Sequence, residues 1–385
     1  MRRLAIIVTH PIQYYAPVFK LLHLTAGVAL KVFYTAGAPG AGKYDHGFKQ
    51  QVVWDLPLLD GYPYEWVPNA AQHPGSHHFN GIVNPDIIAK ITAFDPDALL
   101  VYGWSYRAHL QVLRHFKGKL PVLFRGDSTL LDQQSFLRTV IRGLLLRWVY
   151  RHVDHAFYTG INSKRYFLAY GLRERQLSFA PHAIDNERFL LSRAGESKQL
   201  RETLSIGNES VLILFAGKFE SKKDPHLLLE AFLQLRANAA HLLFVGNGEL
   251  EPSLKAAAGQ AVNVHFLGFQ NQTVMPVIYQ SCDLFCLPSR GPGETWGLAV
   301  NEAMASGKPV LVSNKVGCAT DLVQQGQTGM VFSADSLADL HAKLQELVEK
   351  GRDELGLMGG LSRERIQIFS FENQTKAIIN IVKNG

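Results

Sequence analysis

Two glutamates eight positions apart offer the clearest chemistry in this sequence. In the stretch GETWGLAVNEAMASGKPVL, Gly293–Leu311, Glu294 falls in a loop rich in glycine and proline, and Glu302 falls inside a short helical pattern. A carboxylate accepts hydrogen bonds from hydroxyl groups, and the first amides of a helix lack partners within it and so favour anions. This arrangement suits a ligand with a sugar, a diphosphate and a ribose. The residues that we expect to contact such a ligand here are Glu294, Thr295, Trp296, Gly297, Leu298 and Glu302.

Two lysines lie in a loop that follows an earlier apolar run. The run VLILFAG continues into GKFESKKDPHLLLEAF, where Lys218 and Lys223 flank a loop that begins at Gly217, and a helix opens near Pro225. Two cations beside a helix N-terminus suit a diphosphate, whereas lysines taken alone are usually solvated surface residues. A weaker signal is LLFVGNGEL, which places Asn247 between two glycines at the end of another apolar run.

The apolar runs that precede these loops predict a doubly wound α/β architecture. Nearly uniform apolar strands alternate with helical patterns such as RAHLQVLRHF, as expected when helices cover both faces of a parallel sheet. The alternation breaks in polar, turn-rich sequence at Leu177–Ser197 and then restarts, so we expect two domains, residues 1–183 and 184–365. Ligands of such sheets bind at the carboxyl ends of the strands. The predicted strands of the first half are Leu4–Thr9, Ala29–Thr35, Ala98–Gly103, Pro121–Gly126 and His155–Gly160.

Composition narrows the class of protein. The chain has 385 residues, a net charge of +6 and three cysteines without paired spacing, which favour a globular protein of a reducing compartment. The mild positive charge suits an anionic ligand better than nucleic acid. The apolar run at the N-terminus is too short for a signal peptide, and no stretch is long enough to span a bilayer. We therefore expect a cytoplasmic protein.

The paired aspartates of the chain do not predict a metal site. Asp95 and Asp97 are separated by Pro96 and are followed directly by a predicted strand. An Asp-Pro-Asp sequence of this kind is typical of a turn that leads into a strand. We therefore expect no metal site at this pair of aspartates and identify no site for another cofactor in the sequence.

The glutamate and lysine motifs together resemble the retaining GT-B glycosyltransferases of family 4. The likeness rests on Gly217-Lys218, Lys223 and Glu294 with seven residues before Glu302, followed by NEAMASGKPVLVS, over roughly residues 210–325. It implies two Rossmann-like domains, of which the C-terminal one binds a UDP- or GDP-linked sugar without a metal. Lys218, where the family more often has arginine, and Lys223 would neutralise the diphosphate. Glu294 would contact the donor hexose and Glu302 the ribose.

The first domain departs from the family pattern. Many members have a glycine pair after the first strand, whereas this chain has THPIQYY with His10. Where others show a histidine after a later strand, this chain has FRGDS with Asp127. Either His10 or Asp127 would orient the acceptor hydroxyl, and a hydrogen-bonded structural role for His10 is an equal alternative. The resemblance also implies that a C-terminal helix, predicted at residues 366–385, packs back on the first domain.

The predicted activity is retaining transfer of a hexose to a glycan or lipid-linked glycan, in the biosynthesis of a surface polysaccharide or glycoconjugate. The acceptor attacks on the face from which the diphosphate leaves, so that catalysis is mainly positioning and charge stabilisation. Two alternatives stay open. An epimerase or hydrolase on the same scaffold would consume the donor without an acceptor, and a non-catalytic sensor would bind it without turnover.

A basic stretch in the first half has a separate interpretation. FLRTVIRGLLLRWVYRHV, Phe136–Val153, carries four arginines at helical spacing beside a broad apolar face. Such a helix is typical of peripheral contact with an anionic membrane. A core helix with a solvated basic rim has the same pattern, so the sequence leaves both open.

Overall fold

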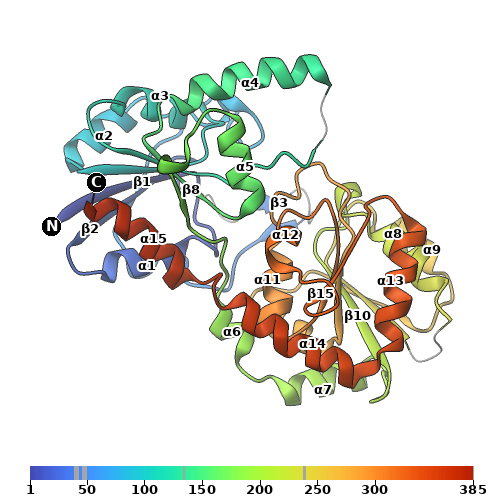
Figure 1. Cartoon of the computed structure of the whole chain (residues 1–385). Coiled ribbons are helices and arrows are strands. Elements are labelled where there is room, and N and C mark those ends of the chain that lie inside the picture. The colour runs from blue at the N-terminus through green and yellow to red at the C-terminus, as the bar shows by residue number, and fades with distance from the viewer. Residues whose placement is uncertain (39–42, 46–49, 133–134, 237–239, 385) are drawn as a thin grey trace. The chain divides into compact units, whose positions relative to one another are not determined.

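The computed structural model describes residues 1–38, 43–45, 50–132, 135–236 and 240–384 (Figure 1). The chain groups into two compact units, each described by itself. Unit 1 comprises Met1–Ala41, Pro57–His182 and Phe371–Gly385, and unit 2 comprises Gly42–Leu56 and Ala183–Ser370. Residues 42–56, which the sequence analysis placed in the first domain, thus group with unit 2. Loop contacts account for this grouping, because the Asn271 side-chain amide donates to the Val53 carbonyl over 2.7 Å.

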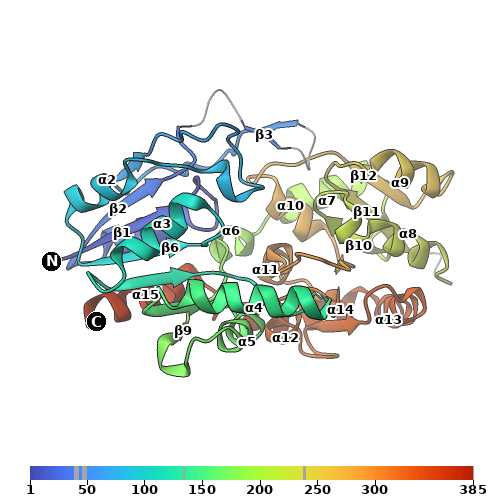
Figure 2. The same ribbon diagram turned by 90° about the horizontal axis from the view of Figure 1, so that it is seen from above.

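Unit 1 is built on a parallel sheet. Within the described residues it has seven strands in the order β5-β2-β1-β6-β7-β8-β9, and β2, β1 and β6 lie side by side in Figure 2. The predicted strands are present, whereas the short and partly exposed β5 and β9 were not anticipated. The strands are β1 Arg2–Val8, β2 Val28–Tyr34, β5 Tyr64–Trp66, β6 Ala98–Tyr102, β7 Val122–Arg125, β8 His155–Tyr158 and β9 Leu177–Phe179.

Helices flank this sheet and bury their apolar sides against it. The predicted helix RAHLQVLRHF is α3. The C-terminal helix predicted at residues 366–385 is present but begins later, at Phe371, since α14 of unit 2 (Gly351–Ile366) extends to Ile366. That last helix, α15, packs against α1 with Ile378 fully buried (Figure 1). The α-helices described in unit 1 are α1 Ala16–Leu24, α2 Ile87–Phe94, α3 Arg107–Phe116, α4 Phe136–Tyr150, α5 Ile161–Ala169 and α15 Phe371–Asn384.

Unit 2 repeats the architecture. In its described part, six parallel strands run in the order β12-β11-β10-β13-β14-β15, and β3 Lys43–Asp45 pairs with β4 Gln50–Val52 in a small separate sheet. The predicted α/β class with two Rossmann-like sheets is therefore confirmed. The strands are β10 Val211–Ala216, β11 Ala240–Val245, β12 Val264–Leu267, β13 Leu284–Leu287, β14 Val310–Ser313 and β15 Gly329–Phe332. The helices are α6 Asn186–Leu190, α7 Ala194–Thr203, α8 Pro225–Leu233, α9 Glu251–Ala258, α10 Met275–Ser281, α11 Leu298–Ala305, α12 Ala319–Leu322, α13 Leu337–Glu349 and α14 Gly351–Ile366.

The strand order fixes where a ligand is expected. In each sheet the first strand in sequence lies inside the sheet, and the order reverses beside it: between β1 and β6 in unit 1, and between β10 and β13 in unit 2. Loops that leave the carboxyl ends of such neighbouring strands diverge, which opens a crevice for ligands. The lysine loop follows β10 and the Glu294 loop follows β13.

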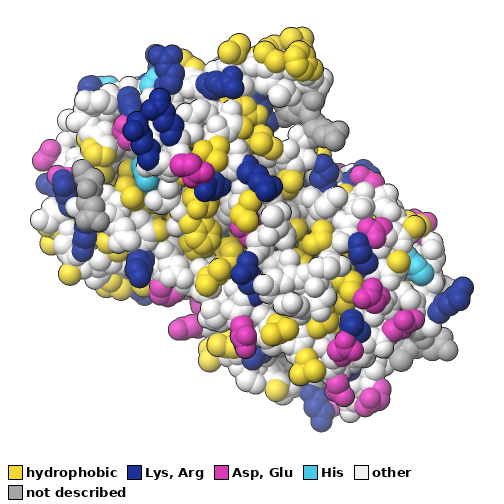
Figure 3. Space-filling view, in the orientation of Figure 1, with side chains coloured by type: hydrophobic (Ala, Val, Ile, Leu, Met, Phe, Trp, Pro, Cys, Tyr) yellow, Lys and Arg dark blue, Asp and Glu magenta, His cyan; other side chains and the backbone are white. Residues whose placement is uncertain are grey.

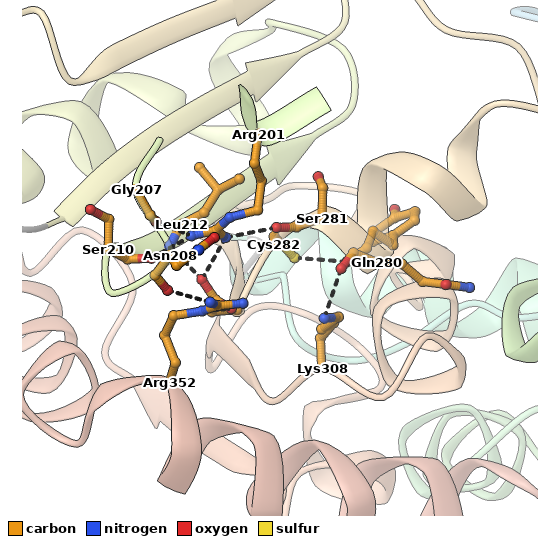
Figure 4. Close-up of polar contacts among 12 residues, drawn as sticks. Arg201, Gly207, Asn208, Ser210, Leu212, Gln280, Ser281, Cys282, Lys308 and Arg352 are labelled. Carbon is orange, nitrogen blue, oxygen red and sulfur yellow. Dashed lines mark hydrogen bonds and ion pairs between the residues drawn. The ribbon is translucent and has the colours of Figure 1, made fainter. Parts of the chain in front are cut away.

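A buried ionic cluster holds together the amino ends of the unit 2 strands (Figure 4). Asp283, just before β13, accepts hydrogen bonds from Arg201 of α7 at 2.9 Å, Arg352 of α14 at 2.9 Å and the Leu212 amide of β10 at 2.8 Å. Arg201 also donates to the carbonyl of Ser281 at 3.0 Å. One carboxylate therefore ties two helices and two strands together.

None of the helices in the described part of the chain combines the length and the apolar character needed to cross a bilayer.

Candidate functional site

The loops after β10 and β13 meet through an ion pair. Lys223 Nζ lies 2.7 Å from Glu294 Oε2, and Ser289, in the loop after β13, donates its hydroxyl to the same oxygen over 3.1 Å. The side chains of Lys223 and Glu294 are 15% and 10% exposed, so the interpretation of Lys223 as a solvated surface residue is wrong. The structure thus brings together the two charged residues that the sequence analysis placed in separate motifs.

Glu294 stays ionised in this setting. Burial by itself raises the pKa of its carboxyl group, but the charge and hydrogen bond of Lys223, the Ser289 hydroxyl and the more distant Lys222 outweigh burial. The net result is a pKa below the usual value of a glutamate. A carboxylate held negative beside an ammonium group is suited to accept hydrogen bonds from ligand hydroxyls.

Glycines bring the backbone of neighbouring strand ends unusually close. Gly217 has a φ of +152°, and a Cβ built on it would lie 3.4 Å from the Lys223 side chain. Gly246 has a φ of +136°, and a Cβ there would lie 2.0 Å from the Gly217 carbonyl oxygen. Asn247, next to Gly246, accepts a hydrogen bond from the Phe269 amide over 2.7 Å. Gly246, which gave only a weak signal in the sequence, is therefore required by this close approach.

The loop before α11 is held by its own backbone. Gly297, with a φ of +97°, precedes the first residue of α11, Leu298, as the sequence predicted. The Gly317 amide donates to the Glu294 carbonyl over 3.0 Å, and a Cβ on Gly317 would lie 1.7 Å from the Thr295 carbonyl oxygen. Trp296 is buried and donates its indole N–H to Asn301 over 2.8 Å. The helix start is thus positioned in advance of any ligand.

Glu302 lies on the buried side of α11. It is 4% exposed, and its Oε2 accepts a hydrogen bond from the Tyr279 hydroxyl over 2.9 Å. Glu302 is therefore not a solvent-exposed residue of this helix. Its predicted contact with a ribose stays a prediction.

The remaining predicted residues lie in unit 1. His10, after β1, has its Nδ1 2.8 Å from the Thr9 hydroxyl. Asp127, after β7, interacts electrostatically with Tyr15, raising the pKa of that phenol, although burial is the larger cause. It also opposes a larger effect of burial and of Arg125, which together lower the pKa of His182 to about 4.

The cluster around Asp127 sits at the carboxyl ends of the unit 1 strands. Tyr15 follows β1, and its ring lies 4.8 Å from that of Tyr102 at the end of β6 and 6.1 Å from that of His182, after β9. Sequence reasoning missed Tyr15 and His182, as it missed Ser289 in unit 2. All three are polar side chains in loops that follow strands, and they belong to no motif that a sequence search would recognise.

A family model described as glycosyl transferases group 1 matches residues 196–357, which lie in unit 2. Sulfoquinovosyl transferase SQD2 of Arabidopsis thaliana is 28% identical over 312 residues, which cover 77% of this chain and 58% of that protein. D-inositol 3-phosphate glycosyltransferase of Rhodococcus opacus is 27% identical over 222 residues, covering 54% and 48%. The chain spans about half the length of these relatives.

Solved structures share the fold along the whole chain. HepE of Anabaena, in complex with UDP and glucose, aligns with a TM-score of 0.73 at 20% identity and covers 100% of both chains. WaaG, a glycosyltransferase involved in lipopolysaccharide biosynthesis, aligns with a TM-score of 0.67 at 14% identity and covers 99% of this chain and 100% of its own. At such identities the likeness shows the fold alone.

Proposed function

We propose that this chain, which belongs to the glycosyl transferases group 1 family and has the GT-B fold, transfers a hexose from a nucleoside-diphosphate sugar to an acceptor with retention of configuration. The observation that carries the proposal is the Lys223–Glu294 pair between the β10 and β13 loops, within the region that the family model matches. It combines a cation for phosphate with a carboxylate for hydroxyl groups at the strand-order reversal of unit 2.

When the proposed donor binds, the ion pair between Lys223 and Glu294 gives way to two contacts with the donor, one for each side chain. Lys223, together with Lys218, neutralises the diphosphate, while Glu294 accepts hydrogen bonds from hexose hydroxyls and the start of α11 faces the phosphates. The bond between the anomeric carbon and the phosphate oxygen breaks as the acceptor oxygen bonds to that carbon. The acceptor proton goes to the departing phosphate oxygen. The protein stabilises charge and holds geometry, which are large terms in such reactions.

The names of similar proteins suggest where to look for substrates. HepE has been solved with UDP and with UDP-glucose, so we propose a UDP-linked hexose as the first donor to test, with GDP-linked sugars next. The relatives include a sulfoquinovosyl transferase and a galactosyltransferase of the lipopolysaccharide outer core. These names support a glycan or lipid-linked acceptor.

Replacing Lys223 tests this proposal against a matched lysine elsewhere in unit 2. We expect Lys223→Ala to lower turnover by about a hundredfold, because the leaving diphosphate loses one of its two cations. Lys255→Ala is the control, since Lys255 of α9 also pairs with a carboxylate, Glu251, at 2.8 Å but is 53% exposed. Donor affinity is measured by saturation-transfer NMR and turnover by product formation with a panel of acceptors.

Each alternative has its own outcome in this experiment. Donor consumption without an acceptor would indicate a hydrolase or an epimerase, and donor binding without any turnover would indicate a sensor. Near-normal turnover of Lys223→Ala would contradict the proposed site.

A further inference from the structure

The helix α4 of unit 1 exposes an apolar stripe. Leu137, Ile141, Leu144 and Trp148 are 68%, 59%, 65% and 36% exposed. At about 100° per residue these positions share one side of the helix. The opposite side packs into the core, with Leu146 and Val149 fully buried. The sequence therefore specifies two apolar sides on this helix, and the core uses one of them.

Arginines border the exposed stripe. Arg138 lies on one flank and Arg147 and Arg151 on the other by the same helical geometry, and the helix contains no acidic residue. Among the described residues these three arginines form no ion pair with a side chain of the protein. Arg142 differs, because it turns inward and donates to the Tyr166 hydroxyl over 3.3 Å. In Figure 3 apolar side chains gather over this helix at the top of the view, with basic side chains nearby.

An open groove continues the basic rim onto α3. Its volume is about 860 Å³, and its charged lining is entirely cationic or imidazole: Arg107, Arg114, His115 and His152. The groove is joined to the stripe through Trp148, since the guanidinium of Arg114 lies 5.4 Å from the centre of that ring and His152 packs 5.3 Å from it. A neighbouring hollow is lined by Leu145, Trp104 and Leu110.

We propose that α4 and the Arg107–Arg114 groove form a docking surface for an anionic lipid bilayer. The apolar stripe enters the interface between head groups and acyl chains, and the arginine rim and the groove bind lipid phosphates. Charge complementarity selects this partner, because an apolar strip between unpaired cations matches a surface that is apolar below and anionic above. The proposal does not depend on the glycosyltransferase activity.

The test is sedimentation of the full-length protein with vesicles, in the absence of a donor. We expect binding to phosphatidylcholine vesicles that contain phosphatidylglycerol, weak binding to pure phosphatidylcholine, and weakening with added salt. Ile141→Glu and Leu144→Glu should each lower the partition coefficient by about tenfold or more. Arg147→Gln and Arg151→Gln should each lower it by about fivefold, the factor that corresponds to about 1 kcal/mol per basic residue.

Leu357→Glu is the matched control, because Leu357 is 75% exposed on α14 of unit 2. It should leave binding unchanged. Thermal unfolding of each variant serves to check that it is folded. Absent binding, or equal binding by the α4 variants and the control, would overturn the proposal. Self-association that Leu144→Glu abolishes, without vesicle binding, would assign the surface to a second copy of the chain instead.

Discussion

The described part of unit 2 has a buried ionic cluster at each end of the strands of its sheet, and the two clusters differ in what their charged groups bind. At the amino ends of the strands, Arg201 donates to Asp283 and to backbone carbonyls, including that of Ser210 at 2.6 Å. At the carboxyl ends, Lys223 and Glu294 bind chiefly each other and come from two loops. Charges bonded to backbone fix the fold, whereas a pair of side chains on loops can exchange its partner for a ligand. The cluster at the amino ends of the strands therefore stabilises the fold, whereas the pair at the carboxyl ends is placed to bind a ligand.

Disrupting the cluster around Asp283 should have the largest effect on stability. Asp283→Ala leaves two arginines without their carboxylate and an amide of β10 without its acceptor. Breaking a buried pair in this way costs about 3–5 kcal/mol, so we expect a loss of about 4 kcal/mol in the free energy of unfolding, measured by urea denaturation. Donor affinity, measured well below the melting temperature, should not change. A variant that keeps its stability but loses the donor would reverse the roles of the two clusters.

Acidic pH should destabilise unit 1 before it affects the ionic clusters of unit 2, because unit 1 buries a neutral imidazole. His109 is fully buried, with Nδ1 3.1 Å from the carbonyl oxygens of Tyr102 and Gly103 and Nε2 2.8 Å from the Thr35 hydroxyl. Burial lowers its pKa from 6.5 to about 4, although the two carbonyls oppose the shift. Since only the unfolded chain takes up a proton between these values, stability is complete above pH 6.5 and declines as the pH falls to about 4.

At about 1.36 kcal/mol per pKa unit, His109 should account for a loss of about 3 kcal/mol across this window. Urea denaturation at neutral and at acidic pH should show a smaller loss in His109→Gln than in the wild type. In the same window Glu294 stays ionised because its pKa is lowered, so its contribution is lost only below the pH where a free glutamate titrates. Equal losses in the wild type and His109→Gln would show that His109 titrates normally.

Neutralising the functional pair should lower turnover more than stability. Glu294→Gln keeps the size of the side chain but removes the charge that Lys223 and sugar hydroxyls would meet. We expect turnover to fall by about a hundredfold, equivalent to about 2.7 kcal/mol of transition-state stabilisation, with a change in unfolding free energy of about 1 kcal/mol. Glu220→Gln is the control, since that glutamate pairs with Lys222 in the same loop. A stability loss as large as that of Asp283→Ala would make Glu294 a second structural anchor.

The sequence predicted the functional cluster better than the structural one. Glu294 and Lys223 lie in loops whose glycines and flanking apolar strands can be recognised locally, so their motifs were predictable. The order of the strands was not, and it is seen only in the structure. The partners of Asp283 come from α7 and α14, about 80 residues before it and about 70 after it, and no local pattern connects them. The burial of Glu302 and the cluster of Tyr15, Asp127 and His182 likewise depend on packing between distant segments.

The smallest expected effect is a loss of turnover on replacing a residue of unit 1, which tests whether the two units have different roles. Asp127 lies in unit 1, whereas the proposed donor residues lie in unit 2. If Asp127 positions the acceptor hydroxyl, Asp127→Asn should lower turnover by about tenfold through lost orientation and leave donor affinity unchanged in saturation-transfer NMR. Asp86→Asn, an exposed aspartate that precedes α2, is the control. A matching loss of donor affinity would place Asp127 in donor binding, and unchanged turnover would leave His10 as the residue that orients the acceptor.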